Sequence, residues 1–161
     1  MTIKQKYQEK LESCKKLLHD SQNIGPSLEA EKMFDDGHAL MEELLQTKDT
    51  EVLCELFDLF TEELDYTGIC ETLENGIRCN FTELQIIGVL YKKFDQLIVN
   101  NISRAIYVSQ PIVEYGFFSE FRKMFNNVAS QRSLDFLNEF CDFYPELENE
   151  IAILREDMQK W

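Results

Sequence analysis

Histidine is the first side chain to consider for chemistry, because its imidazole is a common metal ligand and a frequent general base. The chain has two, His19 and His38, and neither belongs to an HExxH or comparable ligand spacing. The one acid-x-x-His sequence, from Asp35 to His38, has no second copy, although a di-iron helical bundle requires two. We therefore expect structural positions for both histidines, and the sequence predicts no metal and no cofactor.

Cysteine is the second candidate, as a nucleophile or a metal ligand. The five cysteines stand singly, without a CxxC pair, at Cys14, Cys54, Cys70, Cys79 and Cys141. An odd number of isolated thiols is typical of a reducing compartment, where cysteine packs as a small apolar side chain. The sequence thus predicts no disulfide framework. Cys79 falls in an expected loop and is the candidate exposed thiol.

Paired acids are the third candidate, because two carboxylates can act as general acid and base or bind a divalent cation. Adjacent acids occur at positions 35–36, 42–43 and 62–63, and a solvated acidic face accounts for them. Phosphate-binding glycine loops, a GxSxG elbow and a calcium loop are absent from the sequence. The sequence therefore predicts that the protein is not an enzyme. An enzyme whose site is assembled from distant residues stays an alternative, which a deep pocket lined by Cys, His or paired acids would support.

The pattern that we single out is a row of acids at helical spacing. Glu51, Glu55, Asp58 and Glu62 follow one another at intervals of four, three and four. On one continuous helix they would share an arc of about 60°. No Lys or Arg lies between positions 49 and 77, and like charges at this spacing cost a helix about 0.2–0.5 kcal/mol per pair. We interpret the row as a surface for a cationic partner, and its predicted binding residues are Glu51, Glu55, Asp58, Glu62, Glu63, Asp65, Glu71 and Glu74. The alternative is an acidic surface that aids solubility and needs no partner.

The distribution of charge supports a basic partner. The net charge is −14, and residues 21–80 hold fifteen Asp/Glu against three Lys/Arg, giving −12. Such a field repels nucleic acid and anionic membranes and speeds the approach of basic proteins. The sequence therefore excludes binding to nucleic acid or to a membrane surface, and it leaves the oligomeric state open.

The elements that hold these groups are all expected to be helices. Apolar residues recur at spacings of three and four, and only three prolines and six glycines interrupt them. The spacing predicts nine helices, over residues 3–19, 27–46, 50–62, 65–75, 82–98, 102–108, 112–128, 133–143 and 145–158. In the second of these, Leu28 and Phe34 are expected to point inward, and Gly37 is expected to loosen the helix.

The predicted fold class is all-α, an irregular antiparallel stack or bundle of about eight to nine helices in a single domain over residues 1–161. Helix pairs recur every thirty-odd residues, so a HEAT-like arrangement is open, although no residue-level repeat accompanies it. Aromatic side chains are dense between positions 115 and 144, and of the adjacent pair Phe143 and Tyr144 one is expected to be exposed.

The expected location is the cytoplasm. No apolar run reaches the length of about 18 residues that a membrane span requires. The first ten residues hold three lysines and no apolar core of the secretory type, so we expect no signal peptide.

In size, helicity and charge, and in the segment LCELFDLFTEEL at residues 53–64, the chain resembles the small acidic helical immunity proteins of bacterial toxin systems. The resemblance is strongest to those of contact-dependent growth inhibition, and it covers the whole chain. It implies a cytoplasmic protein that binds one cognate toxin domain, often a basic nuclease, and blocks its active site or substrate groove. The carboxylates would then stand in for substrate phosphates. The alternative function is a helical-repeat adaptor or scaffold that binds a basic partner.

Overall fold

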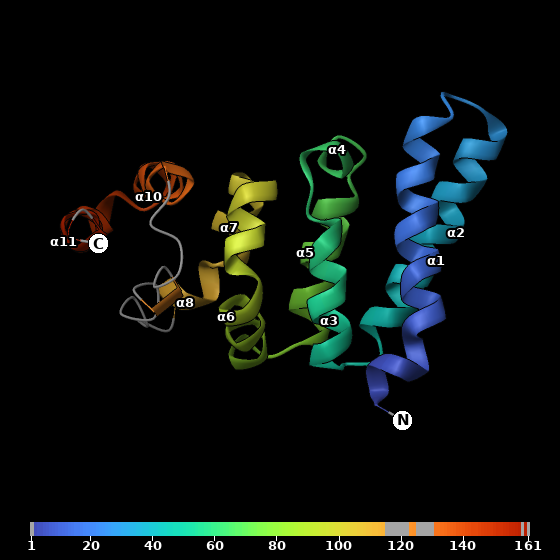
Figure 1. Ribbon diagram of the computed structural model, residues 1–161, viewed down its shortest axis with the longest axis horizontal. Coiled ribbons are helices and arrows are strands. Elements are labelled where there is room, and N and C mark those ends of the chain that lie inside the picture. Colours follow the sequence, from blue (N-terminus) through green and yellow to red (C-terminus); the bar gives the residue numbers. More distant parts are fainter. Residues whose placement is uncertain (1, 115–122, 125–130, 159, 161) are drawn as a thin grey trace. The chain divides into compact units, whose positions relative to one another are not determined.

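The computed structural model describes residues 2–114, 123–124, 131–158 and 160 (Figure 1). Ten α-helices and two short 3-10 helices occur in these residues, which contain no strand. The predicted all-α class is confirmed. The elements run in the order α1 (Ile3–Asn23), α2 (Leu28–Leu45), α3 (Thr50–Leu56), η1 (Phe57–Leu59), α4 (Glu62–Asp65), α5 (Ile69–Asn80), α6 (Glu83–Asn100), α7 (Ile102–Val108), α8 (Gln110–Glu114), α10 (Gln131–Phe143), η2 (Pro145–Leu147) and α11 (Glu148–Met158).

Part of the predicted seventh helix, over 112–128, lies outside the described residues. The same holds for the aromatic residues at 115, 117, 118, 121 and 125. Within the described pair, Phe143 is 50% exposed and Tyr144 is half-buried, which confirms that the two side chains do not share the core.

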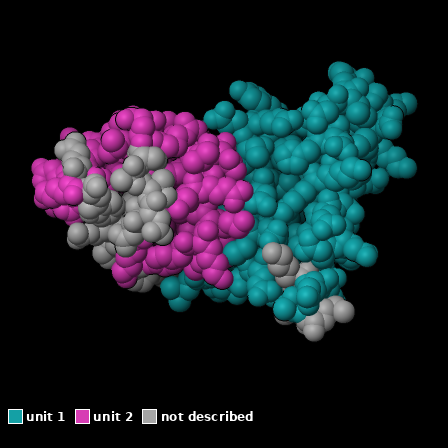
Figure 2. Space-filling model, viewed as in Figure 1, with its two compact units in different colours: residues 1–85 teal, residues 86–161 magenta. Residues whose placement is uncertain are grey.

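The chain divides into two compact units, residues 1–85 and residues 86–161 (Figure 2). Each unit has its own apolar core. The expectation of one domain over 1–161 stays a prediction.

The first unit is built on the antiparallel pair of α1 and α2, which lie side by side (Figure 1). Their contact is close because Gly37 has no side chain. A Cβ at this position would lie 2.8 Å from Leu18 Cγ, and the Cys14 thiol donates a hydrogen bond of 3.4 Å to the Gly37 carbonyl. Gly37 therefore does not loosen α2, as the sequence had suggested, but admits α1 to its surface.

A second glycine has the same role in α5. This helix was predicted over residues 65–75, to end just before Gly76, but it begins at Ile69 and continues to Asn80. A Cβ on Gly76 would lie 2.5 Å from Leu45 Cδ1, so the glycine marks the place where α5 meets α2. A glycine often follows the last residue of a helix. Here the glycine lies inside α5, because Leu45 of another helix leaves no room for a side chain.

The second unit packs α7 and α11 against α10. Its centre holds the rings of Phe94 and Phe136, which meet edge to face with centroids 5.0 Å apart. Arg132, on α10, donates from Nε to the Ile98 carbonyl at 2.9 Å and thereby binds one of the last carbonyls of α6. This contact fixes the end of α6 to α10.

The predicted helix starts at Ser27 and Thr82 are confirmed. The Ser27 hydroxyl accepts from the Ala30 amide at 3.1 Å. The capping box before α6 pairs the Thr82 amide with Gln85 Oε1 at 2.9 Å and the Gln85 amide with Thr82 Oγ1 at 3.3 Å.

The five cysteines form no disulfide. Burial raises the pKa of the Cys14 thiol to about 12, so this thiol stays protonated at neutral pH. Cys79 is exposed, as predicted, but it lies on α5 and not in a loop. Among the described residues, no helix has both the length and the apolar character of a membrane span.

Candidate binding surface

The predicted third helix is interrupted, and this changes the geometry of the acidic row. The α-helix α3 ends at Leu56, a 3-10 turn follows, and Phe60 leaves the helix with ψ at 75°. Thr61 then caps α4 by accepting from the Leu64 amide at 3.2 Å, with Glu62 in the first turn. The prediction of one helix through Glu62 is therefore wrong, and Glu62 does not continue the face of Glu55. A threonine followed by acids at the helix start was the sequence signal for this break.

Two members of the row share one cation from another part of the chain. Lys15, on α1, donates to Glu55 Oε2 at 2.9 Å and to Asp58 Oδ2 at 2.8 Å. The side chains of the three residues are 24%, 22% and 31% exposed. The interpretation of the row as uncompensated is therefore wrong for Glu55 and Asp58, because the cation comes from a helix that lies 40 residues away in the sequence.

The pKa of Lys15 reflects this environment. Burial lowers the pKa of the ammonium group, but hydrogen bonds to Asp58 and Glu55, with the charges of both carboxylates, outweigh burial. The pKa of Lys15 is therefore raised above its ordinary value of 10.5. The three side chains form a stable charged cluster that ties α3 and η1 to α1.

The other predicted binding residues have varied surroundings. Glu63 Oε2 lies 4.0 Å from His19 Nδ1 on α1, and Glu74 pairs with Arg78 at 3.2 Å one turn along α5. The side chain of Glu74 is only 12% exposed. Asp65 is half-buried. The predicted residues that stay exposed at the surface are Glu51, Glu62, Glu63 and Glu71.

Even with these ion pairs, residues 1–85 remain strongly acidic. They hold nineteen Asp/Glu and eight Lys/Arg, for a net charge of −11, whereas residues 86–161 hold eleven and eight, for −3. The negative field of the protein is therefore concentrated on the first unit.

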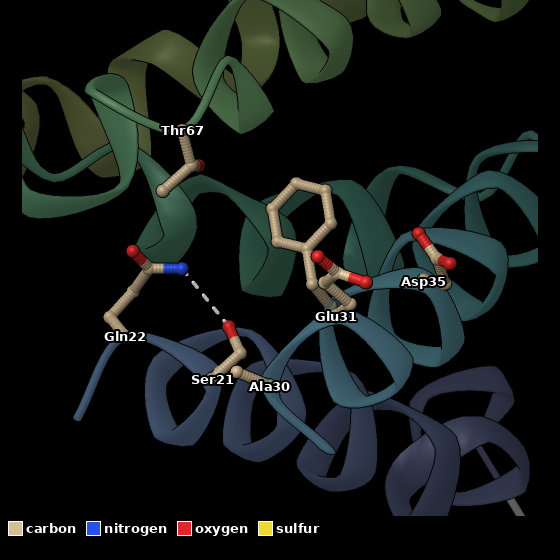
Figure 3. A pocket seen from close by; sticks show the side chains of 7 residues that line it. Ser21, Gln22, Ala30, Glu31, Asp35 and Thr67 are labelled. Carbon is tan, nitrogen blue, oxygen red and sulfur yellow. Dashed lines mark hydrogen bonds between the residues drawn. The ribbon is translucent and has the colours of Figure 1, made fainter. Parts of the chain in front are cut away.

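The first unit also has a pocket of about 370 Å³ (Figure 3). Three elements form it: the end of α1, the N-terminal half of α2, and the turn between α4 and α5. In Figure 3 the side chain of Thr67 lies across the pocket from those of Ser21 and Gln22, and Glu31 and Asp35 stand along one side. The complete lining is Ser21, Gln22, Ala30, Glu31, Phe34, Asp35 and Thr67.

Two large apolar residues that are close in sequence to the lining residues are almost fully exposed. Leu28 is 85% exposed and precedes the lining residue Ala30 by two positions. Tyr66 is 93% exposed and directly precedes Thr67. The prediction that Leu28 points inward is wrong, and the prediction for Phe34 is only partly met, because that ring is half-buried. The spacing of apolar residues could not reveal the pocket, because its walls come from three separate segments of the chain.

The residues that could carry out chemistry are distributed as follows in the described part of the chain. No cluster of three or more His, Cys, Asp or Glu side chains suited to a metal ion occurs there. The pocket contains acids but neither of the histidines and none of the cysteines.

Comparison with known proteins identifies no relative: no protein-family model matches the chain, and neither a curated protein nor a solved structure is significantly similar to it.

Proposed function

We propose that this chain is a protein-binding domain of the immunity-protein type, which acts in the cytoplasm and neutralises a basic toxin domain, such as a nuclease, by covering it. The observation that supports the proposal is the net charge of −11 on residues 1–85. Such a field accelerates the approach of a cationic protein and selects against wrong partners.

The carboxylates for this role are the exposed ones. Glu62 and Glu63 begin α4, and Glu71 lies in the first turn of α5. A basic partner can reach these side chains without opening the Lys15 cluster. Glu55 and Asp58, in contrast, stabilise the fold through Lys15, and we assign them a structural role beside the binding surface.

The test is a growth assay in which the chain is co-expressed with the C-terminal domain of a large secreted protein encoded by the adjacent gene. Charge reversal by Glu62→Lys, Glu63→Lys and Glu71→Lys together should abolish protection. The dissociation constant of the purified complex should rise about 10- to 100-fold, mainly through slower association, and the effect should shrink at high salt.

The matched control reverses three acids at the start of another helix, in the second unit. These residues, all exposed, are Glu146, Glu148 and Glu150. The control changes the net charge by the same amount. If the first unit is the binding surface, the dissociation constant of the control should stay within about threefold of the wild-type value. Equal losses in both variants would contradict a defined surface. The lack of any toxin-like neighbouring gene would contradict the immunity role itself.

A further inference from the structure

We propose, on the basis of the proposed function, that the pocket between α1, α2 and the α4–α5 turn is the docking site for one arginine side chain of the basic partner. The pocket is small, near the lower end of the range of about 300–1,000 Å³ that is typical of ligand sites. It can therefore hold a single side chain, and the partner's remaining surface would lie over its rim.

The hydrogen-bonding groups of the pocket favour a donor. The Ser21 hydroxyl donates its proton to the Leu18 carbonyl at 2.8 Å, and the Thr67 hydroxyl donates to the Leu64 carbonyl at 2.6 Å. The Gln22 amide donates to Ser21 Oγ at 3.0 Å (dashed in Figure 3). Both hydroxyl protons are thus used within the chain. Ser21 Oγ also accepts from Gln22, and Thr67 Oγ1 accepts from the Ile69 amide at 3.3 Å, so each hydroxyl keeps one lone pair for a ligand. A donor-rich group fits such a site, and an anion does not.

The charge of the pocket favours a cation. Glu31 and Asp35 are exposed and lie one helical turn apart on α2, so they share a face, and both line the pocket. Leu28 lies on the same face one turn earlier. The neighbouring cation Lys32 is exposed on α2 but does not line the pocket. A positive group in the pocket would relieve the repulsion between the two carboxylates.

The apolar surroundings distinguish arginine from lysine. Phe34 lines the pocket and stacks on His38, with the two rings 6.4 Å apart and 9° from parallel. Tyr66 and Leu28, which are exposed, neighbour the lining residues Thr67 and Ala30 along the chain. A planar guanidinium is weakly hydrated, packs against aromatic rings and binds a carboxylate through two parallel hydrogen bonds. The compact, strongly hydrated ammonium of lysine gains less from such a site.

The test is an NMR titration of the full-length protein with the peptide Ac-Gly-Arg-Gly-NH2. We expect amide shifts centred on residues 30–35 and 67, with weak, saturable binding. The citrulline peptide has nearly the same shape without the charge and should cause no such shifts. The lysine peptide should bind several-fold more weakly.

Two variants with the same change of charge locate the site. In Glu31→Gln/Asp35→Asn the dissociation constant for the arginine peptide should rise about fivefold, because each exposed ion pair contributes a factor of about 1.4 to 5. The control is Glu29→Gln/Asp36→Asn, on the same helix and exposed but outside the lining, and it should leave the constant unchanged.

Three results would overturn the proposal: equal binding of the arginine and lysine peptides, shifts spread over the whole acidic unit, or equal effects of the two variants. Because the titration needs no partner protein, its failure would leave the proposed function standing. Conversely, a failure to protect in the growth assay would contradict the proposed function and leave the peptide result unchanged.

Discussion

The Lys15 cluster yields the sharpest prediction. Replacing Lys15 by Met removes the cation but keeps most of the aliphatic stem, so the packing of α1 changes little. Glu55 and Asp58 then lose the cation that both of them bind. We expect the free energy of unfolding at pH 7 to fall by about 2 kcal/mol.

The magnitude follows from the geometry. Two oxygens that lie 2.9 and 2.8 Å from one nitrogen are at most about 5.7 Å apart, where like charges repel by about 0.7 kcal/mol in water and about 3 kcal/mol at an effective dielectric constant of about 20. These side chains are 22–31% exposed, which places them between the two limits. The lost hydrogen bonds add to the repulsion, and solvent screening reduces both effects.

The assay is urea unfolding followed by circular dichroism, with amide hydrogen exchange to separate residues 1–85 from residues 86–161. The control is Lys16→Met, because Lys16 is the exposed neighbour on the same helix, and its effect should stay within about 0.5 kcal/mol. The triple variant Lys15→Met/Glu55→Gln/Asp58→Asn should recover about half of the loss, since neutral amides do not repel each other. Equal stability of the two single variants, or no recovery in the triple variant, would refute the reasoning.

Three further outcomes are expected. From pH 7 to pH 10.5 the stability difference between the wild type and Lys15→Met should be complete, and it should vanish as the pH rises through the raised pKa of Lys15, as urea unfolding at several pH values would show. Gly37→Ala should cost about 1–3 kcal/mol in thermal unfolding, because its Cβ would lie 2.8 Å from Leu18 Cγ; a neutral effect would mean that α1 and α2 can separate. Arg132→Met should speed hydrogen exchange at the end of α6 and cost about 1–2 kcal/mol, and unchanged exchange there would contradict its contact with the helix carbonyls.

Local signals in the sequence were reliable where the structure depends on neighbours along the chain. The helix starts at Ser27 and Thr82 appear as predicted, because both ends of each capping hydrogen bond lie within one turn. The break at Thr61 was missed although its signal was local. The apolar spacing continues through the break, and periodicity outweighed the cap in our interpretation.

Signals that depend on distant neighbours were misleading. Gly37 and Gly76 suggest a loose helix and a helix end, yet both are contact points whose partners, Leu18 and Leu45, lie on other helices. The exposed position of Leu28 has the same origin. Leu28 lies at the start of α2, on the face that continues with Glu31 and Asp35, and it is 85% exposed.

By itself, the sequence determined that the chain is helical and that its negative charge gathers in the first half, because apolar period and composition are properties of short segments. Only the tertiary structure decided which carboxylates pair with a cation and where a pocket opens. Lys15 meets Glu55 and Asp58, and Thr67 closes the pocket of α2, through contacts between helix faces. Coulomb energy and burial depend on the distance between groups in space, and the separation of two residues along the chain does not determine that distance.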